Sequence, residues 1–215
     1  MTEMSSRANE LNEGASAEAD RAVVNGAASA SAVPASIPDA VRFYVDCEFD
    51  GHNGDLISIA MVREDGVGLH VIAEDARITD PWVDENVIPI LLSHHAAWTE
   101  IVTGNKVGTI LRTFLGGEQN PVIVADSPVD IGRFCRAIST GEDGGWQSVH
   151  LPRMTFEVHN VDCYPTRLEG AVQHNAWWDA MALRDKLAQA IEAGAAKTEG
   201  LGPKDESAVP NGDAS

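Results

Sequence analysis

The sequence has few cysteines and no long apolar run. Its 215 residues include three cysteines, Cys47, Cys135 and Cys163, and none belongs to a C-x-x-C pair. An odd count at these spacings argues against a disulfide framework and against a structural zinc site. No apolar run approaches the length of about 18 residues that a membrane-spanning helix requires, and the N-terminus lacks the pattern of a secretory signal. The sequence therefore predicts a cytoplasmic protein with no membrane partner.

Basic residues are also scarce. The chain has 15 Lys and Arg residues against 33 Asp and Glu residues, which gives a formal net charge of −18, of which residues 40–193 carry −12. Binding to long duplex DNA depends on Lys and Arg side chains that neutralise phosphates, so a body this acidic disfavours it. A small site in which metal ions supply the positive charge remains compatible with this composition.

Composition divides the chain into one central domain and two tails. Residues 1–39 are rich in Ala, Ser, Glu and Asn without a sustained period, and residues 194–215 are similar. Such segments cannot bury enough apolar surface to order themselves, so both are expected to be disordered. Residues 40–193 are long enough to form a single core that buries roughly 70% of the unfolded surface.

Hydrophobic periodicity in this domain predicts an α/β fold. Three strands, at 41–49, 56–64 and 69–74, are separated by the turn sequences GHNGD and DGVG and predict an antiparallel meander. Alternating strands and helices follow, and hairpin strands before such a series indicate a mixed sheet flanked by helices. The expected helices are 80–93, 105–117, 129–140 and 175–194, the last ending at Gly194, and the further strands are 121–126 and 154–164.

Two acids interrupt the first of these strands. Asp46 and Glu48 follow the apolar start of "RFYVDCEFDG", where more apolar residues would be expected. Residues two apart in a strand point to the same face, so both charges are directed at one spot. Burying charge is costly unless something pairs with it, and a divalent metal ion would do so.

Further candidate ligands lie at the ends of later elements. In "VIVADSPVDIGRF" a buried strand ends at Asp126 and a helix starts near Asp130, where an acid is equally consistent with a favourable charge at a helix N-terminus. In "HNAWWD" five residues separate His174 from Asp179, a rotation of about 500° in a helix. We therefore expect His174 on the preceding loop or cap and Asp179 on the inner face of the helix.

Each motif has an ordinary explanation when it is taken alone. An Asp-x-Glu pair is common and usually lies on a solvated surface, His174 could be a cap or surface residue, and Asp130 could be a helix-start acid. Their joint occurrence, at ends of elements that can converge at one sheet edge, favours a shared site.

Together the three motifs resemble those of the DEDDh 3′–5′ exonucleases, and within them the ribonuclease T-like branch. The resemblance covers about residues 46–179 and implies a ribonuclease H-like fold with His174 as general base. The helix-start pattern DIGRFC favours Asp130 over Asp126 as the second-motif acid, which leaves Asp126 a supporting role beside the substrate. The metal-site acids implied by the resemblance are Asp46, Glu48, Asp130 and Asp179.

The resemblance also implies a chemistry. Two Mg²⁺ or Mn²⁺ ions would sit among the acids, and the enzyme would release nucleoside monophosphates from a single-stranded 3′ end, RNA more than DNA. Phe49 is expected to pack on the terminal base or sugar, with core packing as the equal alternative. A non-catalytic module that binds nucleotides or RNA ends on the same fold is the alternative function. Family members are often homodimers, but nothing in the sequence identifies a dimer face.

Overall fold

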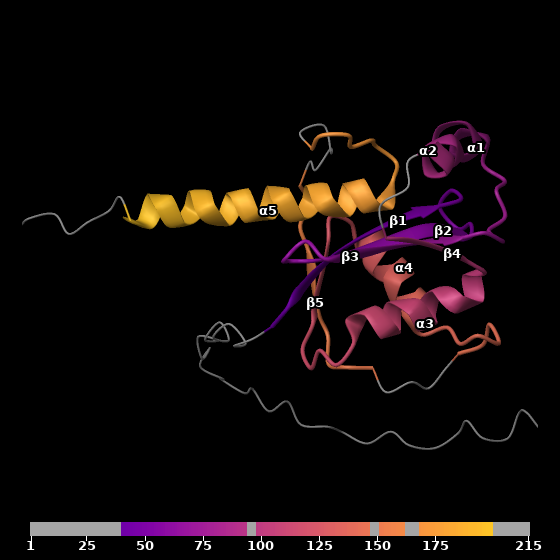
Figure 1. Ribbon diagram of the computed structural model, residues 1–215, viewed down its shortest axis with the longest axis horizontal. Coiled ribbons are helices and arrows are strands. Elements are labelled where there is room, and N and C mark those ends of the chain that lie inside the picture. Colours follow the sequence, from indigo (N-terminus) through magenta and orange to yellow (C-terminus); the bar gives the residue numbers. More distant parts are fainter. Residues whose placement is uncertain (1–39, 94–97, 147–150, 162–167, 200–215) are drawn as a thin grey trace, which may run out of the picture. The chain divides into compact units, whose positions relative to one another are not determined.

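The computed structural model describes residues 40–93, 98–146, 151–161 and 168–199 (Figure 1). The predicted N-terminal tail, Cys163 and the end of the strand expected at 154–164 lie outside this part of the chain.

In the part of the chain that the structure describes, six strands form one sheet in the order β4-β3-β2-β1-β5-β6. Strand β1 (Arg42–Phe49) pairs antiparallel with β2 (Leu56–Arg63), which pairs antiparallel with β3 (Gly68–Ala73). Strand β5 (Val122–Ala125) runs parallel to β1, and β6 (Thr155–Val158) runs parallel to β5. The predicted α/β class is confirmed, and the antiparallel meander followed by parallel strands is a ribonuclease H-like arrangement.

The turn between β2 and β3 forms where DGVG predicts it. The Arg63 amide donates to the Val67 carbonyl at 2.8 Å, and the Asp65 carboxylate accepts from the Val67 amide at 3.1 Å. Gly66 has φ +89°, a conformation that glycine adopts without steric cost. This local turn chemistry fixes the register of the hairpin.

One prediction for the segment after β3 is wrong, and one strand there was not predicted. The single helix expected at 80–93 is two helices, α1 (Pro81–Asn86) and α2 (Ile88–Ser93), because Pro89 lacks the amide hydrogen that an unbroken helix would donate there. Strand β4 (Thr99–Val102), parallel to β3, was not predicted. With four residues at an exposed edge, it is too short to show a period.

The sheet lies between two helical layers. Helices α3 (Gly104–Leu115) and α4 (Pro128–Ile138) cover one face, and α5 (Ala176–Glu199) covers the other (Figure 1). A Cβ on Gly108 of α3 would overlap the Ala137 carbonyl oxygen of α4, so glycine is what lets these two helices approach.

Helix α5 is longer than expected. It runs through Gly194 to Glu199, so the predicted end at Gly194 is wrong. A glycine costs about 1 kcal/mol relative to alanine inside a helix, and the neighbouring alanines are the strongest helix formers. Among the described helices, none combines the length and apolar character that crossing a membrane requires.

Candidate metal centre

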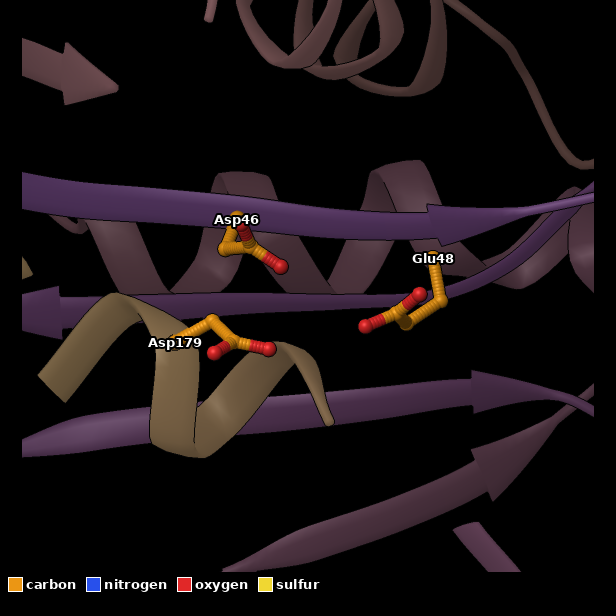
Figure 2. A group of neighbouring side chains, drawn as sticks. All are labelled: Asp46, Glu48 and Asp179. Carbon is orange, nitrogen blue, oxygen red and sulfur yellow. The ribbon is translucent and has the colours of Figure 1, made fainter. Parts of the chain in front are cut away.

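Strand β1 directs its acids to the α5 side of the sheet. Val45 and Cys47 are buried on the opposite side, in the core that α3 and α4 cover. Because side chains alternate along a strand, Asp46 and Glu48 must point the other way. Figure 2 shows both carboxylates leaving β1 on one side and facing the carboxylate of Asp179.

The start of α5 brings in the third acid. Asp179 lies in the first turn of α5, and its carboxylate accepts a hydrogen bond from the Asn175 amide at 3.2 Å. Asn175 is fully buried just before the helix. This bond satisfies an amide at the helix start that has no partner within the helix and holds the Asp179 side chain towards β1.

The junction between β5 and α4 supplies two more acids. Asp126 follows the last residue of β5, and Ser127 caps α4 by accepting from the Val129 amide at 3.1 Å. Asp130 follows in the first helical turn and is buried, with 5% of its surface exposed. Because β1 and β5 are parallel, the acids at this end of β5 reach the same sheet edge as those of β1.

These residues surround one cavity of about 500 Å³. Two groups of three acids have ligand oxygens within 4.8 Å of one another, and Asp46 belongs to both. One group joins β1 to α5, and the other joins β1 to the β5–α4 junction. The members are Asp46, Glu48 and Asp179 in the first group, and Asp46, Asp126 and Asp130 in the second.

Burial, and then the closeness of the acids, opposes their ionisation. Burial, followed by the nearby Asp179 and Asp130 charges, raises the pKa of Glu48 to about 8. Burial also raises the pKa of Asp130 and of Asp179 to about 7. The pKa of Asp46 is raised well above its ordinary value, first by burial and then by the neighbouring Asp130 and Glu48. Without a counter-charge the centre therefore holds protons near neutral pH.

The donor set fits a hard divalent cation. No Lys or Arg is among the described residues that line the cavity, so no side chain there supplies a permanent positive charge. Burial raises the pKa of the Cys47 thiol, which keeps it protonated and unsuited to a softer metal. Oxygen-only ligation favours ions such as Mg²⁺ or Mn²⁺, and the acid groups could hold such ions.

His174 lines the cavity and lies two residues before the start of α5. Its backbone has φ +59°, the one positive φ among the described non-glycine residues. Its ring meets the edge of the Trp82 ring at a centroid distance of 5.0 Å and an interplanar angle of 89°. Trp82 belongs to α1 and is half exposed, so it contributes to the rim of the site more than to the core.

The structure brings every predicted site residue to this cavity. His174 precedes α5 and Asp179 lies within it, as the five-residue spacing predicts. Asp126 is one of the clustered acids, beyond the supporting role that the sequence indicated. The predicted residues that line the cavity are Asp46, Glu48, Phe49, Asp126, Asp130, His174 and Asp179.

Sequence reasoning missed several neighbours of these residues. Asn160 lies just after β6 and Gln173 directly before His174, and both line the cavity. The position of Asn160 follows from topology, because β1, β5 and β6 are parallel and their carboxyl ends meet at one edge. Trp82 carried no signal, since its approach to His174 depends on how α1 packs.

No protein-family model matches the chain, and no curated protein matches it either. The resemblance to the DEDDh exonucleases therefore rests on the three sequence motifs alone.

Proposed function

We propose that the protein is a metal-dependent 3′–5′ exonuclease that removes nucleoside monophosphates from single-stranded nucleic acid, preferentially RNA. The observation that carries the proposal is the pair of acid groups that share Asp46 beside His174. A shared carboxylate between two sets of oxygen ligands suits two cations that act on one phosphodiester.

In this proposal two Mg²⁺ or Mn²⁺ ions would neutralise the phosphate and stabilise the charge that develops on the attacking and leaving oxygens. The acidic side chains of the site would hold the ions and orient the phosphate. Glu48 and Asp179 face each other between β1 and α5 (Figure 2), and Asp126 and Asp130 form the second acid group with Asp46. The positions are set by rigid elements, which keeps the reacting groups aligned.

His174 accepts the proton of the attacking water. An imidazole suits this step because its unprotonated ring nitrogen can accept a proton. The edge contact with Trp82 limits the rotation of the ring. Phe49 lines the same cavity and offers an aromatic surface for the terminal nucleotide. Cys47 and Cys135 are free thiols, which suits a reducing, cytoplasmic working environment.

A gel assay on 5′-labelled single-stranded RNA and its DNA equivalent tests the proposal. The wild type, Asp46→Asn, His174→Ala and the control Glu100→Gln would be compared in Mn²⁺, Mg²⁺ or EDTA. Glu100 is an exposed acid on β4, at the opposite edge of the sheet from β5 and β6. We expect stepwise 3′ shortening by the wild type and Glu100→Gln, and a loss of about 10²–10³-fold or more in Asp46→Asn and His174→Ala.

Several outcomes distinguish the alternatives. Shortening that survives EDTA or Asp46→Asn would overturn the proposed role of the acids. Metal-dependent binding of the 3′ end without shortening, in folded wild-type protein, would indicate the non-catalytic binding module instead.

A further inference from the structure

A second cavity of about 520 Å³ lies beside the metal centre and has different chemistry. It shares no lining residue with the acid cavity. Its walls come from the β1–β2 turn, the segment after β3, the start of α3 and the second half of α4. Three arginines line it, Arg77, Arg133 and Arg136, and we call it the arginine cleft.

The acids of the arginine cleft are already engaged. The Asp55 carboxylate accepts from the Arg77 amide at 3.1 Å and from its Nε at 3.3 Å. The Asp75 carboxylate accepts from the Gly104 amide at 2.6 Å, at the start of α3. The three arginines and two acids that line the cleft give it a net charge of about +1, in a chain whose net charge is −18.

The Arg136 guanidinium in the cleft has hydrogen-bond donors that no described residue uses. It is exposed on α4 and makes no ion pair or side-chain hydrogen bond with any residue that the structure describes. It is not needed to cap α4, because Arg112 donates to the carbonyls of Ile138 and Thr140 at 2.7 and 3.1 Å. A guanidinium with free donors matches the geometry of a phosphate oxygen pair.

Arg133 connects the arginine cleft to the metal centre. Its guanidinium donates to the carbonyls of Gly54 and His52 at 2.6 and 2.8 Å. The same group lies 4.5 Å from the centroid of the Phe49 ring, and Phe49 lines the acid cavity. This stacked pair therefore links the linings of the two cavities, and a strand that leaves the metal centre past Phe49 would meet Arg133 first.

We propose that the arginine cleft binds the phosphates of the nucleotides that precede the terminal one. This inference rests on the proposed function and deepens it, since it gives the substrate a path and a preferred minimum length. The acid cavity repels every phosphate that a cation does not neutralise. The next phosphates along the strand need a positive partner, and Arg77 and Arg136 offer it next to the site. We expect a dinucleotide to be too short to reach the cleft and a hexanucleotide to be long enough.

Fluorescence anisotropy with 5′-labelled RNA dinucleotide and hexanucleotide tests this path. Ca²⁺ would occupy the oxygen ligands, and the wild type would be compared with Arg77→Gln, Arg136→Gln and the double variant. Arg133 is left intact because it holds the β1–β2 turn. Lys186→Gln, which removes a positive charge from α5, is the matched control.

We expect each substitution to weaken hexanucleotide binding by about tenfold, while the dinucleotide keeps its affinity. The dependence of log affinity on log salt should become shallower by about 0.7 for each lost phosphate contact. Equal loss at both lengths, no loss at the hexanucleotide, or no hexanucleotide binding by the wild type would overturn the inference. Competition by inorganic phosphate or a nucleoside monophosphate without any length dependence would also overturn it, in favour of a free-phosphate site.

The binding measurements and the gel assay together separate this inference from the proposed activity. If hexanucleotide binding depends on the arginines but no RNA is shortened in Mn²⁺, the activity fails and the path stands. If RNA is shortened but hexanucleotide binding ignores both arginines, the path fails and the activity stands.

Discussion

The two faces of β1 have opposite chemistry. On one face Phe43, Val45 and Cys47 are buried against the core that α3 and α4 cover. On the other face Asp46 and Glu48 point to α5, where burial and then the neighbouring acids raise the pKa of each. The same eight residues therefore build the fold and place the candidate site.

This difference separates what stabilises the protein from what costs stability. Each apolar side chain of β1 gains about 25 cal/mol per Å² of surface removed from water. Each carboxylate loses hydration and meets like charges, and a bound cation would offset that loss. The acid face is therefore expected to be a strained part of the metal-free protein, and the apolar face is expected to hold it in place.

The largest stability effect should come from the apolar face. Phe43 is 1% exposed and meets the edge of the Phe114 ring at 6.0 Å between centroids. We expect Phe43→Ala to lower the free energy of unfolding by about 3–5 kcal/mol, because it leaves a cavity in the core. Urea unfolding measures this loss. A loss below about 1 kcal/mol would show that the core tolerates or refills the cavity.

The acid face should make the metal-free protein less stable as pH rises. A carboxyl group with a raised pKa binds more protons when the protein is folded than when it is unfolded. Its contribution to the free energy of unfolding is therefore complete below about pH 4 and is lost as the pH rises towards and through the folded pKa. Glu48 at about 8, and Asp130 and Asp179 at about 7, place this loss between about pH 4 and 8, and most of it falls above pH 5. We expect a decrease on the order of 2–3 kcal/mol, measured by urea unfolding in EDTA.

The acids with lowered pKa values do not obscure this window. Hydrogen bonds lower the pKa of Asp50, from the Thr79 side chain first, and of Asp55, from the Arg77 amide first. Their contributions are complete above about pH 4–5. Stability that rises steadily from pH 5 to 8.5 in EDTA would contradict the strained acid face.

A smaller effect is expected from removing one charge. Asp46 belongs to both acid groups, so Asp46→Asn relieves repulsion in each at nearly unchanged volume. We expect it to stabilise the metal-free protein at pH 8 by on the order of 1–2 kcal/mol. Thermal unfolding should show a midpoint higher by about 2–4 °C per kcal/mol. Glu100→Gln, on the exposed edge strand, should leave the midpoint unchanged. An equal rise of the midpoint in Glu100→Gln would show that the stabilisation does not come from the position of Asp46.

Part of the fold could be predicted because its information is local. The meander follows from short apolar runs bounded by turn sequences, such as the turn at Asp65 and Gly66, and the amphipathic helices follow from their period. Strand β4 could not be predicted, because a short edge strand depends on pairing with β3. The end of α5 differs from its prediction because one glycine stops a helix less effectively than the alanines around it extend it.

The candidate site was predicted better than the edges of the fold. Carboxylates inside apolar elements are unusual enough to indicate a site from the residue pattern alone. The distances between side chains could not be predicted from the sequence. It does not show that Asp126 and Asp130 both approach Asp46, or that Arg133 stacks on Phe49. Both contacts depend on how α4 docks against β1.

The most direct test of the acid face is the thermal midpoint of the wild type and Asp46→Asn at pH 8, each in EDTA and in Mn²⁺. In EDTA the variant should melt higher than the wild type. A ligand at 100 times its dissociation constant stabilises by about 2.7 kcal/mol, so Mn²⁺ should raise the wild type above the variant and reverse the order. The same order in both conditions would contradict the claim that the acids of β1 are held together to bind a cation.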